Sequence, residues 1–220
     1  MRETVWGFDD LGFFLGAILP SIVVSTLVTS AIPSIGARGL SYQCVFYALM
    51  LSALYALARV RHGVPFADAV NWSLRFQRAG FIVLGAPLLA FAVSALGGFL
   101  GTPAIPSAID NLTATDIPLP VVAAFAVVLG PLFEELVFRG FLQPLFQRWG
   151  QWPGLLLTSA LFSLLHGAQN EWLWQYLLLL FFAGLAFGLV RQSTNSTAAA
   201  FLLHMGFNLT PLTSSILQQH

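Results

Sequence analysis

The sequence predicts an all-α protein, a polytopic bundle of transmembrane helices. Of its 220 residues, 57% are hydrophobic and only 8% are charged, whereas a soluble domain carries about 25% charged residues. Mean hydropathy is +0.81, and the apolar residues form continuous runs rather than the alternating pattern of a β-barrel strand. This composition excludes a soluble enzyme, a disordered chain and a nucleic-acid-binding protein, which needs a basic surface.

Seven segments are long enough to cross a bilayer, which requires about 20 mostly apolar residues. They are residues 11–32, 40–60, 79–100, 119–141, 153–169, 172–190 and 197–217. The connections between them are short, and we expect one integral membrane domain over residues 1–220. An eighth span would have to lie in the two longest connections, residues 61–78 and 101–118.

The positions of the basic residues, all of which are arginine, predict the orientation. Arg61, Arg75 and Arg78 follow the second segment, whereas the connection after the third segment carries two acidic residues and no basic one. Because cytoplasmic loops are enriched in basic residues, we expect a cytoplasmic N-terminus, with Arg148 and Arg191 on the same side. The predicted location is a prokaryotic cytoplasmic membrane, whose lipid is then the first partner of the protein.

Three charged residues interrupt the fourth segment, in the pattern Glu134-Glu135-x-x-x-Arg139. Each costs about 2.5–3.5 kcal/mol at the centre of a membrane helix, so their retention indicates pairing or chemistry. Glu135 and Arg139 are four residues apart, share a helix face and can form an ion pair. Glu134 points about 140° away from Arg139. It is therefore left without a local counter-charge.

Two later segments carry polar residues at helical spacing, Phe162-x-x-x-His166 and His204-x-x-x-Asn208. Taken singly, each polar group could be satisfied by a neighbouring helix, and the glutamates could form a structural ion pair. With a rise of about 1.5 Å per residue, however, His166 and Glu134 lie at similar depths and Asn208 lies somewhat lower. We expect the groups to converge on one buried polar site.

These three motifs, in this order on three separate segments, resemble those of the CAAX protease and bacteriocin-processing (CPBP, or Abi) family of intramembrane endopeptidases. The resemblance covers about residues 119–212. It implies an all-helical fold and hydrolysis of a peptide bond within the membrane. The implied partner is a peptide or protein substrate, which in some relatives is prenylated.

The resemblance also implies roles for the motif residues. Glu134 would act as a general base together with His166 to activate a water molecule. His204 and Asn208 would stabilise the oxyanion. The remaining motif residues would support the site structurally, and they are Glu135, Arg139 and Phe162.

A zinc ion is the alternative to this metal-free mechanism. Glu134, His166 and His204 would make a His₂Glu zinc set. The chain has no His-Glu-x-x-His motif, and the spacing after His204 places the amide of Asn208, a poor zinc ligand, where a second histidine would be expected. We therefore favour no cofactor, with zinc as the second choice.

Two other function classes are compatible with the sequence. One is a non-catalytic immunity or scaffolding membrane protein on the same fold. The other is a proton-coupled transporter whose intramembrane glutamate and histidine side chains relay protons. A transporter would show internal repeats or paired broken helices, and the sequence has neither. The complete set of motif residues favours the enzyme.

Overall fold

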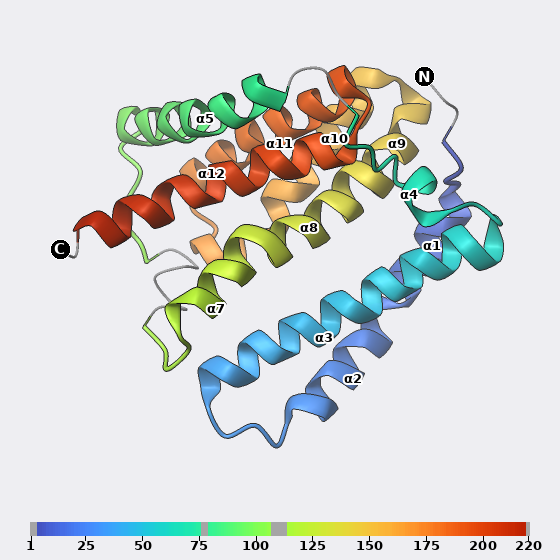
Figure 1. Ribbon diagram of the computed structural model, residues 1–220, viewed down its shortest axis with the longest axis horizontal. Helices are drawn as coiled ribbons and strands as arrows, with labels where there is room; N and C mark the ends of the chain where they lie inside the picture. The colour runs from blue at the N-terminus through green and yellow to red at the C-terminus, as the bar shows by residue number, and fades with distance from the viewer. Residues whose placement is uncertain (1–3, 76–78, 107–113, 219–220) are drawn as a thin grey trace.

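Helices make up nearly all of the computed structural model (Figure 1), which describes residues 4–75, 79–106 and 114–218. No strand occurs within those ranges, and the predicted all-α class is confirmed for them. The long helices run side by side as a bundle, with α2 and α3 at one edge and α5 at the opposite edge (Figure 1).

Each of the seven predicted segments contains a helix. The N-terminal half holds α1 (Phe8–Gly16), α2 (Ile18–Thr29), α3 (Ile35–Ala56), η1 (Leu57–Arg61), α4 (Phe66–Ala69) and α5 (Ala79–Phe99). The C-terminal half holds α7 (Leu119–Ala124), η2 (Phe125–Leu129), α8 (Gly130–Glu135), η3 (Leu136–Leu142), α9 (Gln143–Phe146), η4 (Gln147–Trp149), α10 (Gln151–Leu165), η5 (Ala168–Asn170), α11 (Trp174–Thr194) and α12 (Thr197–Gln218). Of the η segments, the first three are π-helical and the last two are 3₁₀ turns.

Five helices are long and apolar enough to cross a membrane: Phe8–Thr29, Ile35–Arg61, Gly80–Phe99, Leu119–Trp149 and Trp174–Thr194. Of the other two predicted segments, α10 has only 15 residues, and α12, with 22 residues, is not among the five. The count of seven spans therefore stays a prediction. Within the described parts of the two longest connections the only helix is α4, whose 4 residues are too few for an eighth span.

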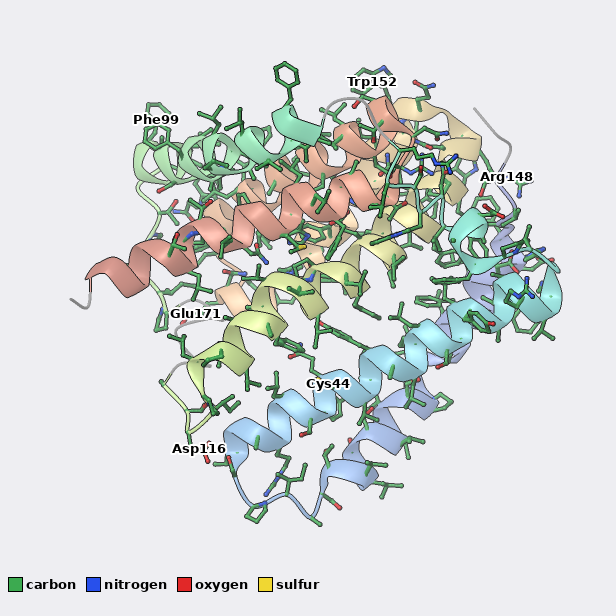
Figure 2. All side chains as sticks on the ribbon, viewed as in Figure 1. Cys44, Phe99, Asp116, Arg148, Trp152 and Glu171 are labelled. Carbon is green, nitrogen blue, oxygen red and sulfur yellow. The ribbon has the colours of Figure 1, made fainter. Side chains whose placement is uncertain are left out.

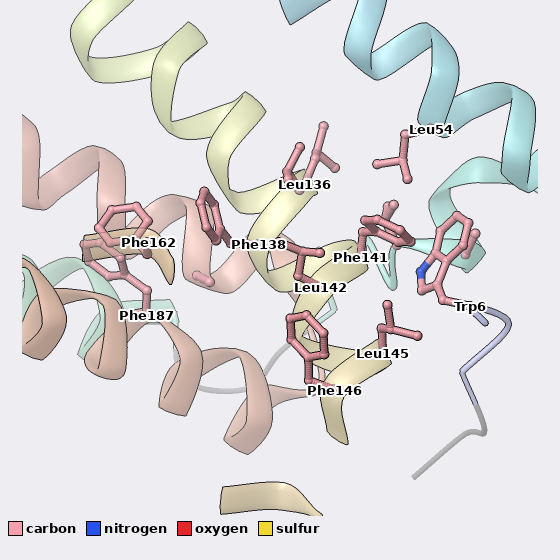
Figure 3. Close-up of a cluster of buried hydrophobic side chains, with 14 of the residues drawn as sticks. Trp6, Leu54, Leu136, Phe138, Phe141, Leu142, Leu145, Phe146, Phe162 and Phe187 are labelled. Carbon is pink, nitrogen blue, oxygen red and sulfur yellow. The ribbon is translucent and has the colours of Figure 1, made fainter. Parts of the chain in front are cut away.

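The helix Leu119–Trp149, here called the central helix, is the most buried of the five. In its most apolar stretch of 18 residues, 50% of the residues are buried. The same share is 17% in each of the helices Phe8–Thr29, Ile35–Arg61 and Gly80–Phe99. The less buried helices therefore turn more of their surface outward, as lipid-facing helices do. Figure 3 shows the apolar cluster around the second half of the central helix, which includes Leu136, Phe138, Phe141, Leu142, Leu145 and Phe146.

The central helix is not a regular α-helix, because the π-helical segments η2 and η3 lie on either side of α8. Pro131, at the start of α8, has no backbone N–H to donate to the preceding turn. In a π turn the backbone carbonyl groups do not follow the regular i→i+4 hydrogen-bond pattern of an α-helix, and such turns are frequent at functional sites. Three carbonyls of the π-helical segments accept hydrogen bonds from distant side chains: Ala126 from Asn208, Arg139 from Arg191 and Gly140 from Trp6.

Two glycines of α11 let its backbone approach the central helix. A Cβ atom at Gly184 would lie 3.3 Å from Arg139 Nη2, and one at Gly188 would lie 3.1 Å from Gln143 Oε1. The Gly184 carbonyl accepts a hydrogen bond from Arg139 Nη2 at 2.8 Å, and the Gly188 carbonyl accepts one from Gln143 Nε2 at 3.2 Å. The Gly-x-x-x-Gly spacing thus brings α11 close enough to hold Arg139 in place.

Candidate active site

Four polar residues of the three motifs line one cavity of about 290 Å³ between the helices. Glu134 reaches it from α8, His166 from the end of α10, and His204 and Asn208 from α12. Aromatic rings form much of the remaining wall, including Phe162. The structure therefore brings together the four side chains that the sequence predicted to converge.

Glu134 lies between the two histidines. Its Oε1 atom is 3.7 Å from Nε2 of His166, and its Oε2 atom is 3.8 Å from Nε2 of His204. The Glu134 side chain is 18% exposed, so its carboxylate can be reached from the cavity. Both distances exceed that of a direct hydrogen bond, which leaves the carboxylate able to accept from a small molecule in the cavity.

Glu135 and Arg139 form the ion pair that their four-residue spacing predicts. Arg139 Nη1 donates to Glu135 Oε1 at 2.9 Å, and both residues are fully buried. The guanidinium also lies over the rings of Phe162 and Phe187, at 4.7 and 5.3 Å from their centroids, and Figure 3 shows these two rings next to each other. A buried charge needs this degree of compensation, because its desolvation costs several kcal/mol.

His204 is held by the same glutamate. Its Nδ1 atom lies 2.9 Å from Glu135 Oε1, and its ring stacks on Phe187 with centroids 4.3 Å apart. Since an ionised carboxylate can only accept, Nδ1 is the donor in this bond. The ring is thereby oriented with Nε2 toward Glu134 and the cavity.

Phe162 orients the His166 ring, and this contact accounts for the spacing of the two residues in the second motif. The His166 Nδ1 atom lies 2.7 Å from the Phe162 carbonyl oxygen, and the two ring centroids are 4.6 Å apart. Because a carbonyl only accepts, Nδ1 carries the proton. The Nε2 atom of a neutral His166 is then an acceptor that faces Glu134.

Asn208 makes a contact that the sequence does not show. Its Nδ2 atom donates to the Ala126 carbonyl of η2 at 2.9 Å, and the side chain also lines the cavity. The amide carries two N–H groups, so one can bind α12 to the central helix while the second stays available to the cavity.

Sequence reasoning missed Tyr47 and Gln43 of α3, which line the same cavity. The Tyr47 ring stacks on Phe133 with centroids 3.9 Å apart and an interplanar angle of 7°. Its hydroxyl lies near the Gln43 side chain and within electrostatic range of Glu134. The signal in the sequence was a pair of polar residues four apart on one face of an apolar segment.

Among the described residues, no group of three or more His, Cys, Asp and Glu side chains is placed so that it could hold a metal ion. The bond from His204 Nδ1 to Glu135 leaves Nε2 directed toward Glu134, which is the orientation that metal-binding histidines adopt. Zinc held by Glu134, His166 and His204 therefore stays the second choice.

Comparison with known proteins places the motifs in a family. Residues 116–210 match the family described as Rce1-like, type II CAAX prenyl endopeptidase. An uncharacterized 24.3 kDa protein of Escherichia coli is 31% identical over 128 residues, which are 56% of this chain and 58% of that protein. The UPF0177 protein YbdI of Lactococcus lactis is 23% identical over 176 residues, which are 78% of this chain and 93% of that protein. No solved structure matches the chain.

Proposed function

Residues 116–210 match the Rce1-like family of type II CAAX prenyl endopeptidases, and from this match we propose that the chain is an intramembrane endopeptidase. The reaction is hydrolysis of a peptide bond in a membrane-associated peptide or protein, and prenylated peptides are the first substrates to test. The observation that carries the proposal is the position of Glu134 between His166 and His204 in a cavity among apolar helices.

Glu134 and His166 can activate a water molecule together. Their facing atoms are 3.7 Å apart. A single water molecule can therefore donate one hydrogen bond to the Glu134 carboxylate and a second hydrogen bond to His166 Nε2. A lone pair of the water oxygen is then free to attack the carbonyl carbon of the substrate. Glu134 takes the proton of the water as the new C–O bond forms and later gives it to the departing nitrogen.

His204 and Asn208 would stabilise the oxyanion of the tetrahedral intermediate. Because His204 Nδ1 already donates to Glu135, the ring can donate through Nε2 only as an imidazolium. Its charge would then face two carboxylates, those of Glu134 at 3.8 Å and Glu135 at 2.9 Å. Asn208 would add its second amide N–H, because the first donates to the Ala126 carbonyl.

The whole chain would form one integral membrane domain with its N-terminus in the cytoplasm. Figure 2 shows Asp116 and Glu171 at one end of the bundle and Arg148 at the opposite end. Arg61 and Arg75 belong to the connection that predicts the cytoplasmic side, whereas Arg78 lies outside the described residues. The arginine end is therefore the proposed cytoplasmic end.

A comparison of wild type with Glu134→Gln tests the function. We expect purified wild-type protein in liposomes to cleave a prenylated C-terminal peptide or proteins of an added membrane fraction, and Glu134→Gln to cleave neither. Glu171→Gln is the matched control, because it removes an exposed carboxylate outside the cavity and should cleave normally. Identical fragments from wild type and Glu134→Gln, or no cleavage by wild type, would contradict the proposal, and proton flux across the same liposomes would then indicate the transporter.

A further inference from the structure

A second cavity lies at the arginine end of the molecule, apart from the candidate active site. Its volume is about 690 Å³, more than twice the 290 Å³ of the first cavity, and the two share no lining residue. Arg148 and Arg191 line it together with Asp68, Asn71 and Asn195. The motifs give this cavity no role.

Arg191 is a buried cation that forms no ion pair with any residue the structure describes. It is only 7% exposed, and its hydrogen bonds go to two neutral oxygens, the Arg139 carbonyl at 3.2 Å and Asn195 Oδ1 at 3.3 Å. No carboxylate of the described residues forms an ion pair with it. A buried charge left unpaired is costly, so an anion in the adjoining cavity would relieve the cost.

The second arginine gives the cavity a net positive charge. Arg148 donates through Nη1 to the Trp6 carbonyl at 3.1 Å, which leaves other N–H groups of its guanidinium for a ligand. Asp68 is exposed and forms no ion pair with either arginine. Two guanidinium groups against one carboxylate favour an anion, and guanidinium matches the oxygen geometry of phosphate particularly well.

We propose that this cavity binds a phosphate group, either that of a phospholipid headgroup or free phosphate. The site lies at the end of the bundle that the arginines assign to the cytoplasmic membrane surface, where lipid phosphates are abundant. Arg191 would also connect it to the candidate active site, because its Nε atom holds the carbonyl of Arg139, whose side chain pairs with Glu135. The proposal concerns binding and does not depend on the protease activity.

Thermal melting of the delipidated full-length protein in a neutral detergent tests the proposal. One arm adds phosphatidylglycerol, a second adds a phosphate-free glycolipid, and a third adds sodium phosphate against sodium chloride at equal ionic strength. Binding to the folded state raises the melting temperature. We expect phosphatidylglycerol, sodium phosphate or both to raise it and the glycolipid not to, and the active arm identifies the source of the phosphate. No rise in either phosphate arm would overturn the proposal.

Arginine variants distinguish phosphate binding in the cavity from attraction of phosphate by general surface charge. Arg148→Gln and Arg191→Lys should raise the half-saturating concentration at least about tenfold, as expected for loss of a charged hydrogen bond. Arg75→Gln is the matched control, because Arg75 is exposed in a connection on the same side and does not line the cavity. Equal responses of Arg148→Gln and Arg75→Gln would overturn the proposal, and Arg148→Gln alone decides it if Arg191→Lys does not fold.

Discussion

The two halves of the molecule hold their charged residues in different ways. In the C-terminal half, Glu135 and Arg139 lie in the protein interior, and α11 and α12 supply their additional partners. In the described part of the N-terminal half, the buried charge is Asp10, which pairs with Arg61 and His62 near the end of the bundle. The pair of Glu135 and Arg139 links helices across the candidate active site. Asp10 instead connects α1 to the end of η1, which follows α3.

This difference indicates how the effects of substitutions should divide. A change in the C-terminal half should alter stability and chemistry together, because the same residues pack the helices and line the cavity. A change in the N-terminal half should alter stability alone, except at residues that line the cavity, such as Tyr47 and Gln43 of α3. Four substitutions test this division.

Glu135→Gln should produce the largest loss of stability. It removes the counter-charge of the buried Arg139 and the acceptor of His204, and breaking a buried ion pair costs about 3–5 kcal/mol. Melting in detergent should show this loss for Glu135→Gln and little change for Glu134→Gln, whose carboxylate forms no direct hydrogen bond with a described side chain. A larger loss at position 134 would reverse the two assignments.

Asn208→Ala should lower kcat by about 10²–10³, the effect of losing one oxyanion donor. KM should change little, because the interaction forms mainly in the transition state. The variant should also melt lower, since it loses the bond to Ala126. A destabilised protein with normal kcat would leave Asn208 with the structural role only.

Asp10→Asn should destabilise the protein without changing its kinetics. The Asp10 carboxylate is 1% exposed and binds the Gly7 backbone N–H in addition to Arg61 and His62. Loss of hydrogen bonds to a charged group costs about 1.5–3 kcal/mol. The melting temperature should fall while kcat and KM stay at wild-type values, and a changed kcat would contradict the division between the halves.

Tyr47→Phe should have the smallest effect, and that effect should be kinetic. The substitution keeps the ring stacked on Phe133 and removes the hydroxyl from the cavity. If that hydroxyl binds the substrate, kcat/KM should fall by about tenfold or less, as for one neutral hydrogen bond, with no change in melting. Tyr55→Phe, which removes a hydroxyl from an exposed position of the same helix, should behave as wild type.

Local spacing predicted much of the molecule. The apolar runs located all seven helical segments, the four-residue spacing predicted the pair of Glu135 and Arg139, and the three motifs predicted the family whose model matches residues 116–210. Each of these features depends on residues within one helix or on a known motif.

The sequence did not predict the contacts between helices. The bond from Asn208 to Ala126 joins residues 82 positions apart, and Tyr47 reaches the cavity only because α3 packs its ring on Phe133. The π-helical segments also escaped prediction, because apolar composition does not distinguish a π turn from an α turn. Helix propensity is a local quantity, whereas these features arise from tertiary packing.

The π-helical segment η3 fixes how many residues the central helix can contain. It lies between Glu134, which faces the cavity, and Gln143, which binds the Gly188 carbonyl. Each residue of a helix turns the chain by about 100°, so deleting one residue from η3 would rotate one of these side chains out of place while the other kept its contact. Substitutions of the apolar side chains within η3 can be absorbed by repacking, but a change of length cannot. Proteins that share this site should therefore vary at these apolar positions without insertions or deletions.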